Sequence, residues 1–271
     1  MDESNEVNEI KKFWNDQAMM HGSSFLATMP DRFLKELEIE NILKFLRDGT
    51  SVVDIGCGNG YSTVYYAKKL NINIQGIDYS EAMIEQANRI QDDLSESLKN
   101  RLSFRNGDVR KTGFKSSIFD TVITDRCLIN LTTRDDQTMA LKEIYRILKP
   151  KGLYLMCEDT EQGLSNLNFV RKYIRLEPIK VRWHNLYLDE HHILSAAKGL
   201  FELVEEVRFS SFYYLASRII NAKVAQEQGI EPKYNSDINR VASLCSSLGC
   251  FGDFGPLKLF VFRKQREEHF V

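Results

Sequence analysis

The chain has 271 residues and a formal net charge of −2, with 43% hydrophobic and 27% charged residues. This composition is ordinary for a globular protein, and the near-neutral charge without runs of like charge predicts no nucleic-acid partner. Neither a leader nor an apolar run of about 18 residues stands out, so we expect a cytoplasmic protein with no membrane partner. The five cysteines are irregularly spaced, which favours free thiols over disulfides or a zinc site.

The first regular elements stand on either side of a run of glycines. Apolar residues at helical spacing predict a helix from the N-cap residue Asp31 to Gly49. Residues 51–55 form a short apolar run before the glycines, which is typical of a buried parallel strand. Residues 61–70 then show helical spacing again.

Strands and helices alternate along the rest of the chain. Further strands are predicted at residues 72–77, 102–105, 119–124, 153–157, 201–207 and 257–262. Helices are predicted at residues 80–94, with Ser80 as the N-cap, and at residues 137–148, where the K-P-K-G turn stops the helix. This alternation favours one doubly wound, mainly parallel sheet.

A glycine-rich turn, D-I-G-C-G-N-G at residues 54–60, closes the first predicted strand. Glycines let the backbone turn tightly and approach a ligand, and the next helix presents free N–H groups to anionic groups. The dinucleotide pattern G-x-G-x-x-G would need glycine where Tyr61 stands. Asp54, two residues before the first glycine, suits an ammonium group better than a pyrophosphate. Asp78 ends the second predicted strand, where a carboxylate can accept both hydroxyls of a ribose.

These residues resemble the motifs of the class I methyltransferases that use S-adenosylmethionine (SAM). The first motif of that family is D-x-G-x-G-x-G, and the second is an acidic residue that ends strand two. The resemblance covers about residues 45–158. Residues 107–109 resemble the segment that holds the adenine and residues 119–125 the fourth-strand motif. Residues 146–152 resemble the R-x-L-K-P-G-G turn, with Lys151 in place of its first glycine.

The resemblance implies SAM as the cofactor and S-adenosylhomocysteine as the product. It assigns cofactor binding to Asp54, Gly56, Cys57, Gly58, Gly60, Asp78, Tyr79, Met83, Gly107, Asp108, Val109 and Asp125. Carboxylates and aromatic faces at such a site can hold the positively charged sulfonium. Asp108 would reach the adenine amino group, and Tyr79 and Met83 would flank the ring. Ordinary core packing is the alternative for Tyr79 and Met83.

The resemblance also implies the fold class and the domain organisation. We expect an α/β protein with a Rossmann-like, doubly wound, seven-stranded sheet whose last strand is antiparallel. A single domain would comprise an N-terminal lid and helix (1–48), a SAM-binding core (49–158) and two substrate caps (159–200 and 208–256, the second a helical cap between the last two strands). Phe13 and Trp14 would exclude water beneath the lid. A purely structural N-terminal arm is the alternative.

The acceptor of the methyl group would bind among the connections after strands four and five and between strands six and seven. The candidates for acceptor binding are His21, Arg126, Asn130, Arg182, Trp183, His184, Tyr187, Tyr213 and Tyr214. The candidates for catalysis are His184, Asp125 and Tyr214, with His184 as a general base because its ordinary pKa lies near neutrality. His184 as a structural residue and Arg126 as an ion-pair partner are the alternatives.

The expected function is methyl transfer to an oxygen or nitrogen of a small polar molecule, for which tyrosine hydroxyls suggest a sugar or nucleotide sugar. We expect no resident metal and a monomer or homodimer. Three alternatives stay open: a SAM-binding protein without transferase activity, a nicotinamide-dependent oxidoreductase, and a metal-assisted O-methyltransferase. The last would use Asp125, Glu158 and Asp159 as oxygen ligands.

Overall fold

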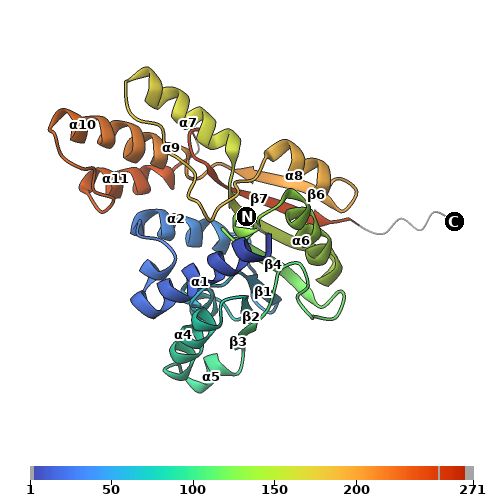
Figure 1. Cartoon of the computed structure of the whole chain (residues 1–271). Helices are drawn as coiled ribbons and strands as arrows, with labels where there is room; N and C mark the ends of the chain where they lie inside the picture. Colours follow the sequence, from blue (N-terminus) through green and yellow to red (C-terminus); the bar gives the residue numbers. More distant parts are fainter. Residues whose placement is uncertain (1–2, 250, 266–271) are drawn as a thin grey trace.

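Seven strands form one sheet in a computed structural model that describes residues 3–249 and 251–265 (Figure 1). The strands are β1 (Ser51–Ile55), β2 (Asn73–Asp78), β3 (Leu102–Asn106), β4 (Phe119–Asp125), β5 (Leu148–Asp159), β6 (Phe201–Val207) and β7 (Leu257–Lys264). Their order is β3-β2-β1-β4-β5-β7-β6, and β7 runs antiparallel to both of its neighbours while the other pairs are parallel. The predicted fold class is therefore confirmed.

Helices cover both faces of this sheet. One face packs on α2 (Arg32–Leu43), α3 (Tyr61–Lys69) and α4 (Glu81–Asp92), and the other on α6 (Arg134–Ile147) and α8 (Glu190–Ala197). A short helix, α5 (Glu96–Lys99), precedes β3. Side chains alternate across a strand, so Leu155 of β5 joins the first core and the neighbouring Tyr154 joins the second.

Several element boundaries differ from the prediction; α6, for example, begins at Arg134 rather than at residue 137. The helix capped by Asp31 ends at Leu43 rather than near Gly49, because the N–H groups of Phe45 and Leu46 bond three residues back and turn the chain into the core. The predicted caps are confirmed, since Asp31 and Ser80 accept from the N–H groups three residues on.

The fifth strand is longer than predicted. It begins before the K-P-K-G turn, because Leu148 already pairs with Phe119 across the edge of β4. Lys151 adopts a left-handed backbone conformation (φ 64°) in the turn. The K-P-K-G turn therefore lies within β5, where the pairing with β4 shifts in register, and is not a coil after α6.

The N-terminal segment is a long helix, α1 (Glu3–His21), followed by a short turn at Phe25–Ala27. Helix α1 packs along α4. Lys11 of α1 pairs with Glu81 (2.5 Å), and the hydroxyl of Ser80, the N-cap of α4, donates to Asn15 Oδ1 (2.6 Å). No helix in the described part of the chain is long and apolar enough to span a bilayer.

The two predicted caps form a group of helices beside the sheet. The first stretch contributes α7 (Glu161–Tyr173), and the second contributes α9 (Ser211–Tyr214), a π-helix (Leu215–Ile220), α10 (Asn221–Glu227) and α11 (Asp237–Ser246). Figure 1 shows α7, α9, α10 and α11 together at the upper left, away from α4 and α5.

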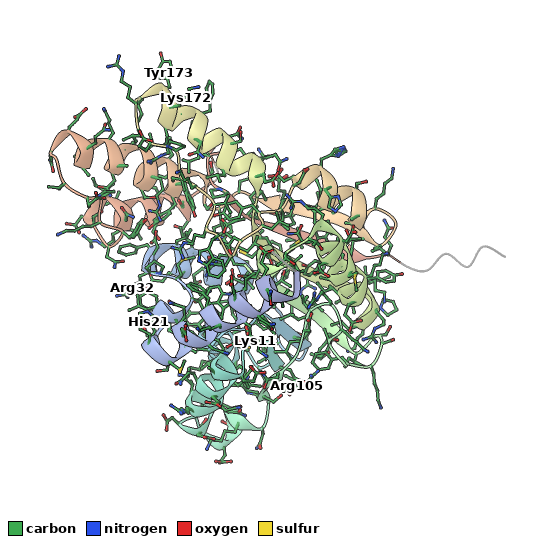
Figure 2. The ribbon with its side chains drawn as sticks, in the orientation of Figure 1. Lys11, His21, Arg32, Arg105, Lys172 and Tyr173 are labelled. Carbon is green, nitrogen blue, oxygen red and sulfur yellow. The ribbon has the colours of Figure 1, made fainter. Side chains whose placement is uncertain are left out.

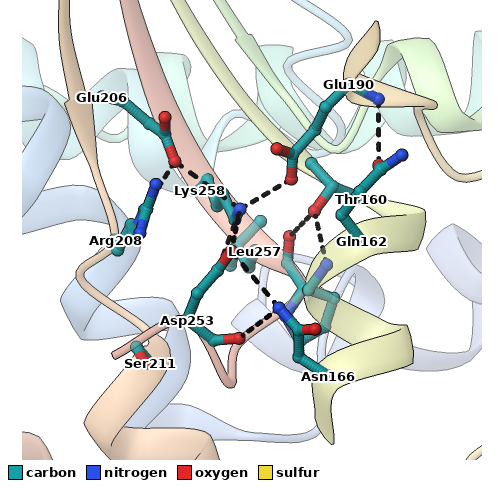
Figure 3. Close-up of polar contacts among 12 residues, drawn as sticks. Thr160, Gln162, Asn166, Glu190, Glu206, Arg208, Ser211, Asp253, Leu257 and Lys258 are labelled. Atoms are coloured by element: carbon teal, nitrogen blue, oxygen red, sulfur yellow. Dashed lines mark hydrogen bonds and ion pairs between the residues drawn. The ribbon is translucent and has the colours of Figure 1, made fainter. Parts of the chain in front are cut away.

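Lys258 links the segment that precedes β7 to α8 and β6 (Figure 3). Its side chain is fully buried on β7, and its Nζ lies 2.6 Å from Glu190, 2.9 Å from Asp253 and 3.6 Å from Glu206. A buried ammonium requires such counter-charges, and removing one leaves an uncompensated charge. The ion pairs thus fix the segment that leads from the cap back into β7.

Candidate active site

A first cavity opens at the carboxyl ends of β1, β2 and β4, beneath α1. Its space is about 870 Å³, part of it open to solvent, and α1 contributes Val7, Ile10 and Trp14 to its wall. The predicted cofactor residues that line it are Gly56, Gly58, Asp78, Tyr79, Met83, Gly107, Asp108, Val109 and Asp125. This is where a doubly wound sheet binds ligands, at the point where the strand order reverses.

The glycine-rich turn forms the floor of the first cavity. Gly58 has a left-handed backbone (φ 54°), and a Cβ there would lie 2.8 Å from the methyl group of Thr28. Gly60 also has a left-handed backbone (φ 77°), and a Cβ there would lie 2.7 Å from the ring of Phe104. Gly60 and Cys57 do not line the cavity, so their contribution to the site is to pack the turn against the sheet.

Asp78 links the end of β2 to this turn. Its two carboxylate oxygens accept from the N–H groups of Gly58 and Ser80, each at 2.9 Å. Burial raises the pKa of Asp78 to about 6, against the opposing effect of these N–H groups. The carboxylate is therefore ionised at neutral pH and held rigidly at the cavity wall.

Asp54 lies behind the turn rather than in the cavity wall. It is almost fully buried and accepts a hydrogen bond from the Thr63 hydroxyl (2.5 Å). Burial raises the pKa of Asp54 to about 7. Direct contact between Asp54 and a cofactor stays a prediction, and in this structure the residue joins β1 to α3.

The adenine end of the predicted site carries an ion pair that sequence reasoning missed. Asp108 lies 2.7 Å from Arg110, which also contacts Asp136 at 2.9 Å. All three residues line the first cavity. Tyr79 lines the same region, and its hydroxyl has no hydrogen-bond partner among residues 3–249 and 251–265. The Tyr79 hydroxyl thus remains free to bond a ligand at this end.

Four buried charges lie beside the first cavity, and we call them the buried quartet: Lys35, Glu38, Asp125 and Arg126. Lys35 lies 2.7 Å from Asp125 and 2.9 Å from Glu38, and Arg126 lies 2.9 Å from Glu38. Burial works against ionisation of Asp125, but the charges of Lys35 and Arg126 lower its pKa. Lys35 and Glu38 were missed, although two charges three residues apart on the apolar side of α2 are an available signal.

A second cavity adjoins the first. Its space is about 710 Å³, part of it open to solvent. Four residues line both: Trp14, Thr28, Arg126 and Asn130. Trp14 donates from its indole N–H to Asn130 Oδ1 (3.0 Å), and this contact holds α1 over the boundary. The remaining wall comes from the start of α2, the end of β5, residues 182–187 and the second predicted cap (residues 208–256), which we call the cap.

His184 lies in this second cavity inside an aromatic cluster. Its ring stacks on Phe13 with 4.3 Å between the ring centroids. The rings of Trp14 and Trp183 lie nearly perpendicular to it, with centroids at 5.5 and 5.3 Å. Burial, with a smaller effect from Arg182, lowers the pKa of His184 to about 4. The imidazole is therefore neutral at pH 7 and a weaker base than an exposed histidine. Its role in catalysis stays a prediction.

The structure separates the predicted acceptor residues into two groups. Those that line the second cavity are Arg126, Asn130, Arg182, His184, Tyr187 and Tyr214. Those that line neither cavity are His21, Trp183 and Tyr213. His21 ends α1 at the edge of the molecule (Figure 2), and Trp183 is 58% exposed. Tyr213 is fully buried, and its hydroxyl donates to Asp31 at 2.6 Å.

The carboxylates considered for a metal site have other partners. Glu158 accepts from the N–H groups of residues 127–129 at 3.0 to 3.4 Å, while Asp125 belongs to the buried quartet. Within the described ranges no group of three metal-ligating side chains occurs. Asp159 instead lines the second cavity with three residues that were not among the predicted acceptor-binding residues, Asp31, Arg218 and Tyr234.

The strand order, together with the position of the glycine-rich turn and Asp78, defines the Rossmann-like fold of class I methyltransferases. Residues 52–152 match the family profile described as a methyltransferase domain. The chain therefore contains a class I methyltransferase domain, and the cofactor of this family is SAM. The predicted family and cofactor are confirmed.

Similar methyltransferases support this assignment over part of the chain. The demethylmenaquinone methyltransferase of Lactiplantibacillus plantarum is 35% identical over 119 residues, which are 43% of this chain and 48% of the relative. The sterol 24-C-methyltransferase of Aspergillus fumigatus is 31% identical over 109 residues, which are 40% of this chain and 28% of the relative. The matched segment spans less than half of the length of either relative.

One solved structure matches almost the whole chain. Geranyl diphosphate C-methyltransferase from Streptomyces coelicolor A3(2), in complex with Mg2+, geranyl diphosphate and S-adenosyl-L-homocysteine, has a TM-score of 0.61 at 13% identity. The match covers 96% of this chain and 98% of that chain. At this identity the likeness concerns the fold.

Proposed function

We propose that this protein transfers the methyl group of SAM to an oxygen or nitrogen of a small polar acceptor that binds in the second cavity. The observation that carries the proposal is the pair of adjoining cavities. One is lined by the cofactor motifs, the other is lined by charged and aromatic side chains, and both share Trp14, Thr28, Arg126 and Asn130.

The residues of the first cavity fit SAM. Asp78 offers a fixed carboxylate to ribose hydroxyls, and glycine at position 58 avoids a Cβ that would lie 2.8 Å from Thr28 of the cavity wall. The Met83 side chain is buried against Trp14 and gives the cavity an apolar wall. When bound, SAM supplies a methyl group on a positively charged sulfur that is already activated for displacement.

The chain's contribution to the reaction is chiefly alignment. Methyl transfer is an in-line displacement, so holding the two reactants in contact can supply much of the rate increase. Arg126 and Asn130 form the boundary across which the two ligands would face each other. Trp14 of α1 covers both cavities and would exclude water from that boundary. A strong base is not required, in keeping with the low pKa of His184.

The polarity of the second cavity favours a polar acceptor over a sterol-like one. His184 Nδ1, Asp159 Oδ1 and Arg218 Nη1 are buried and lack hydrogen-bond partners among the described residues. A hydrocarbon acceptor would leave all three unsatisfied, at a cost of about 1–3 kcal/mol for each. A polar acceptor can supply their missing partners.

The experiment measures S-adenosylhomocysteine formed from SAM by the purified chain across a broad panel of small polar acceptors. We expect acceptor-dependent product that is lost in Asp78→Ala. Binding of SAM without any product across the panel would instead favour a SAM-binding protein without transferase activity. Saturable binding of NAD with no binding of SAM would overturn the proposal.

A further inference from the structure

The second cavity contains a buried carboxylate without a partner. Asp159, at the end of β5, is only 6% exposed and lines the cavity. No hydrogen bond reaches its Oδ1 from any residue that the structure describes. Burial raises the pKa of Asp159 while the charges of Arg126 and Arg182 both lower it, but neither side chain forms an ion pair with it, and Arg126 pairs with Glu38. A buried carboxylate normally has a cation or several donors as partners, so this one is arranged for a ligand.

The same cavity contains a guanidinium with one free edge. Arg218, in the π-helix of the cap, donates from Nη2 to Asp31 (2.6 Å), and its guanidinium lies 4.1 Å from the ring centre of Tyr234. These contacts hold the group still. Its Nη1 is buried and has no partner within the described ranges. A guanidinium held in this way can donate to a carboxylate or another acid group.

Tyr214 lines the same cavity as these two charges. Its ring lies 5.3 Å from the guanidinium of Arg218. Burial raises the pKa of the Tyr214 phenol, and the charge of Asp159 raises it further while that of Arg218 lowers it. Asp159, Tyr214 and Arg218 thus face one shared space, in which a single small molecule could contact both charged groups.

We propose that the second cavity binds a small zwitterion of the amino-acid type, with its amine held by Asp159 and its acid group by Arg218. The inference rests on the proposed function, because it names the chemical class of the acceptor in that same cavity. An uncharged sugar would bring no cation into contact with Asp159, and a simple amine would leave Arg218 Nη1 without an acceptor. The zwitterion satisfies both groups at once.

The test is calorimetric titration of the chain saturated with S-adenosylhomocysteine, using the twenty L-α-amino acids as probes. The hydroxy acid and the decarboxylated amine that correspond to the tightest binder are then compared with it. We expect at least one amino acid to bind at least tenfold more tightly than both of its analogues. Equal binding of an analogue, or no binding by all twenty, would overturn the inference.

Two variants assign the two ends of the ligand. Asp159→Asn is expected to weaken amino-acid binding at least tenfold while leaving the affinity for the hydroxy acid unchanged. Arg218→Lys, which keeps the charge beside Asp31 but removes the free Nη1, is expected to weaken binding of the amino acid and leave that of the decarboxylated amine unchanged. Asp237→Asn, at a carboxylate that is 91% exposed on α11, is the matched control.

Binding of S-adenosylhomocysteine in each variant separates the two hypotheses. If the nucleoside binds and no amino acid does, the inference about the acceptor is wrong and the proposed function stands. If the nucleoside does not bind to the folded wild-type chain, the proposed function itself is wrong. Equal effects of Asp159→Asn and Asp237→Asn would also contradict the inference.

Discussion

The two cavities lie side by side but are built differently. The first is lined by α1 and by short segments at the ends of β1 to β4, and its floor depends on a few glycines and on Asp78. The second is lined by charged and aromatic side chains, which come from the N-cap of α2, the end of β5, the 182–187 segment and residues 214–234. Backbone geometry can be shared by many proteins with one cofactor, whereas side chains can vary with the acceptor. Under the proposed function, the first cavity binds the methyl donor and the second selects the acceptor.

The largest effect is expected where the two cavities meet, at the buried quartet. Glu38→Gln leaves Lys35 and Arg126 with one carboxylate between them, and loss of a buried partner costs about 3–5 kcal/mol. Burial raises the pKa of Glu38 to about 7, so the free energy of unfolding is measured in urea at pH 8, where the carboxylate is ionised.

The control for this change is Glu40→Gln, on the same helix, where Glu40 is exposed and accepts from Tyr65 (2.5 Å). We expect a change of about 0.5 kcal/mol or less in its free energy of unfolding. Equal destabilisation by both variants would show that the quartet does not support the boundary between the cavities.

The second effect tests the first cavity alone. Asp78→Ala removes the carboxylate at its wall and should raise the dissociation constant of SAM at least tenfold, about 1.4 kcal/mol. Calorimetric titration measures it, with Asp92→Ala at an exposed position of α4 as the control. A folded Asp78→Ala chain that binds SAM as the wild type does would refute the assigned site.

The third effect separates backbone strain from cavity shape. Gly58→Ala and Gly49→Ala both force alanine into a left-handed conformation, which costs about 1–2 kcal/mol of stability. Only at Gly58 does the added Cβ also meet a neighbour, at 2.8 Å from Thr28. We therefore expect weaker SAM binding in Gly58→Ala and unchanged binding in Gly49→Ala. The same loss of affinity in both would mean that strain, and not the cavity, controls binding.

The smallest effect is a pH dependence of SAM binding. Burial raises the pKa of Asp78 to about 6, so the free protein gains a proton there as the pH falls through that value. Because an ionised carboxylate would accept the ribose hydroxyls, affinity should fall below pH 6, by roughly tenfold between pH 6 and pH 5 at most. In Asp78→Asn the corresponding decrease should be absent. A decrease that persists in Asp78→Asn would point to another group, such as Asp54.

The same contrast explains how much of the site was predictable. The glycine-rich turn and Asp78 are local in the sequence, and their spacing follows from one strand, one turn and one helix. Asp159 and Arg218 are far apart in the sequence, and only the folding of the cap over β5 brings both to one cavity. Tyr213 and Tyr214 are neighbours, yet helical geometry directs one into the core beside Asp31 and the other into the cavity.

The most direct test of the central claim is a crystal structure of the chain with S-adenosylhomocysteine. The account predicts the ribose on Asp78 and the sulfur at the boundary formed by Arg126 and Asn130, facing the second cavity. A nucleoside bound elsewhere would contradict the account, as would one in the first cavity whose sulfur faces away from Asp159 and Tyr214.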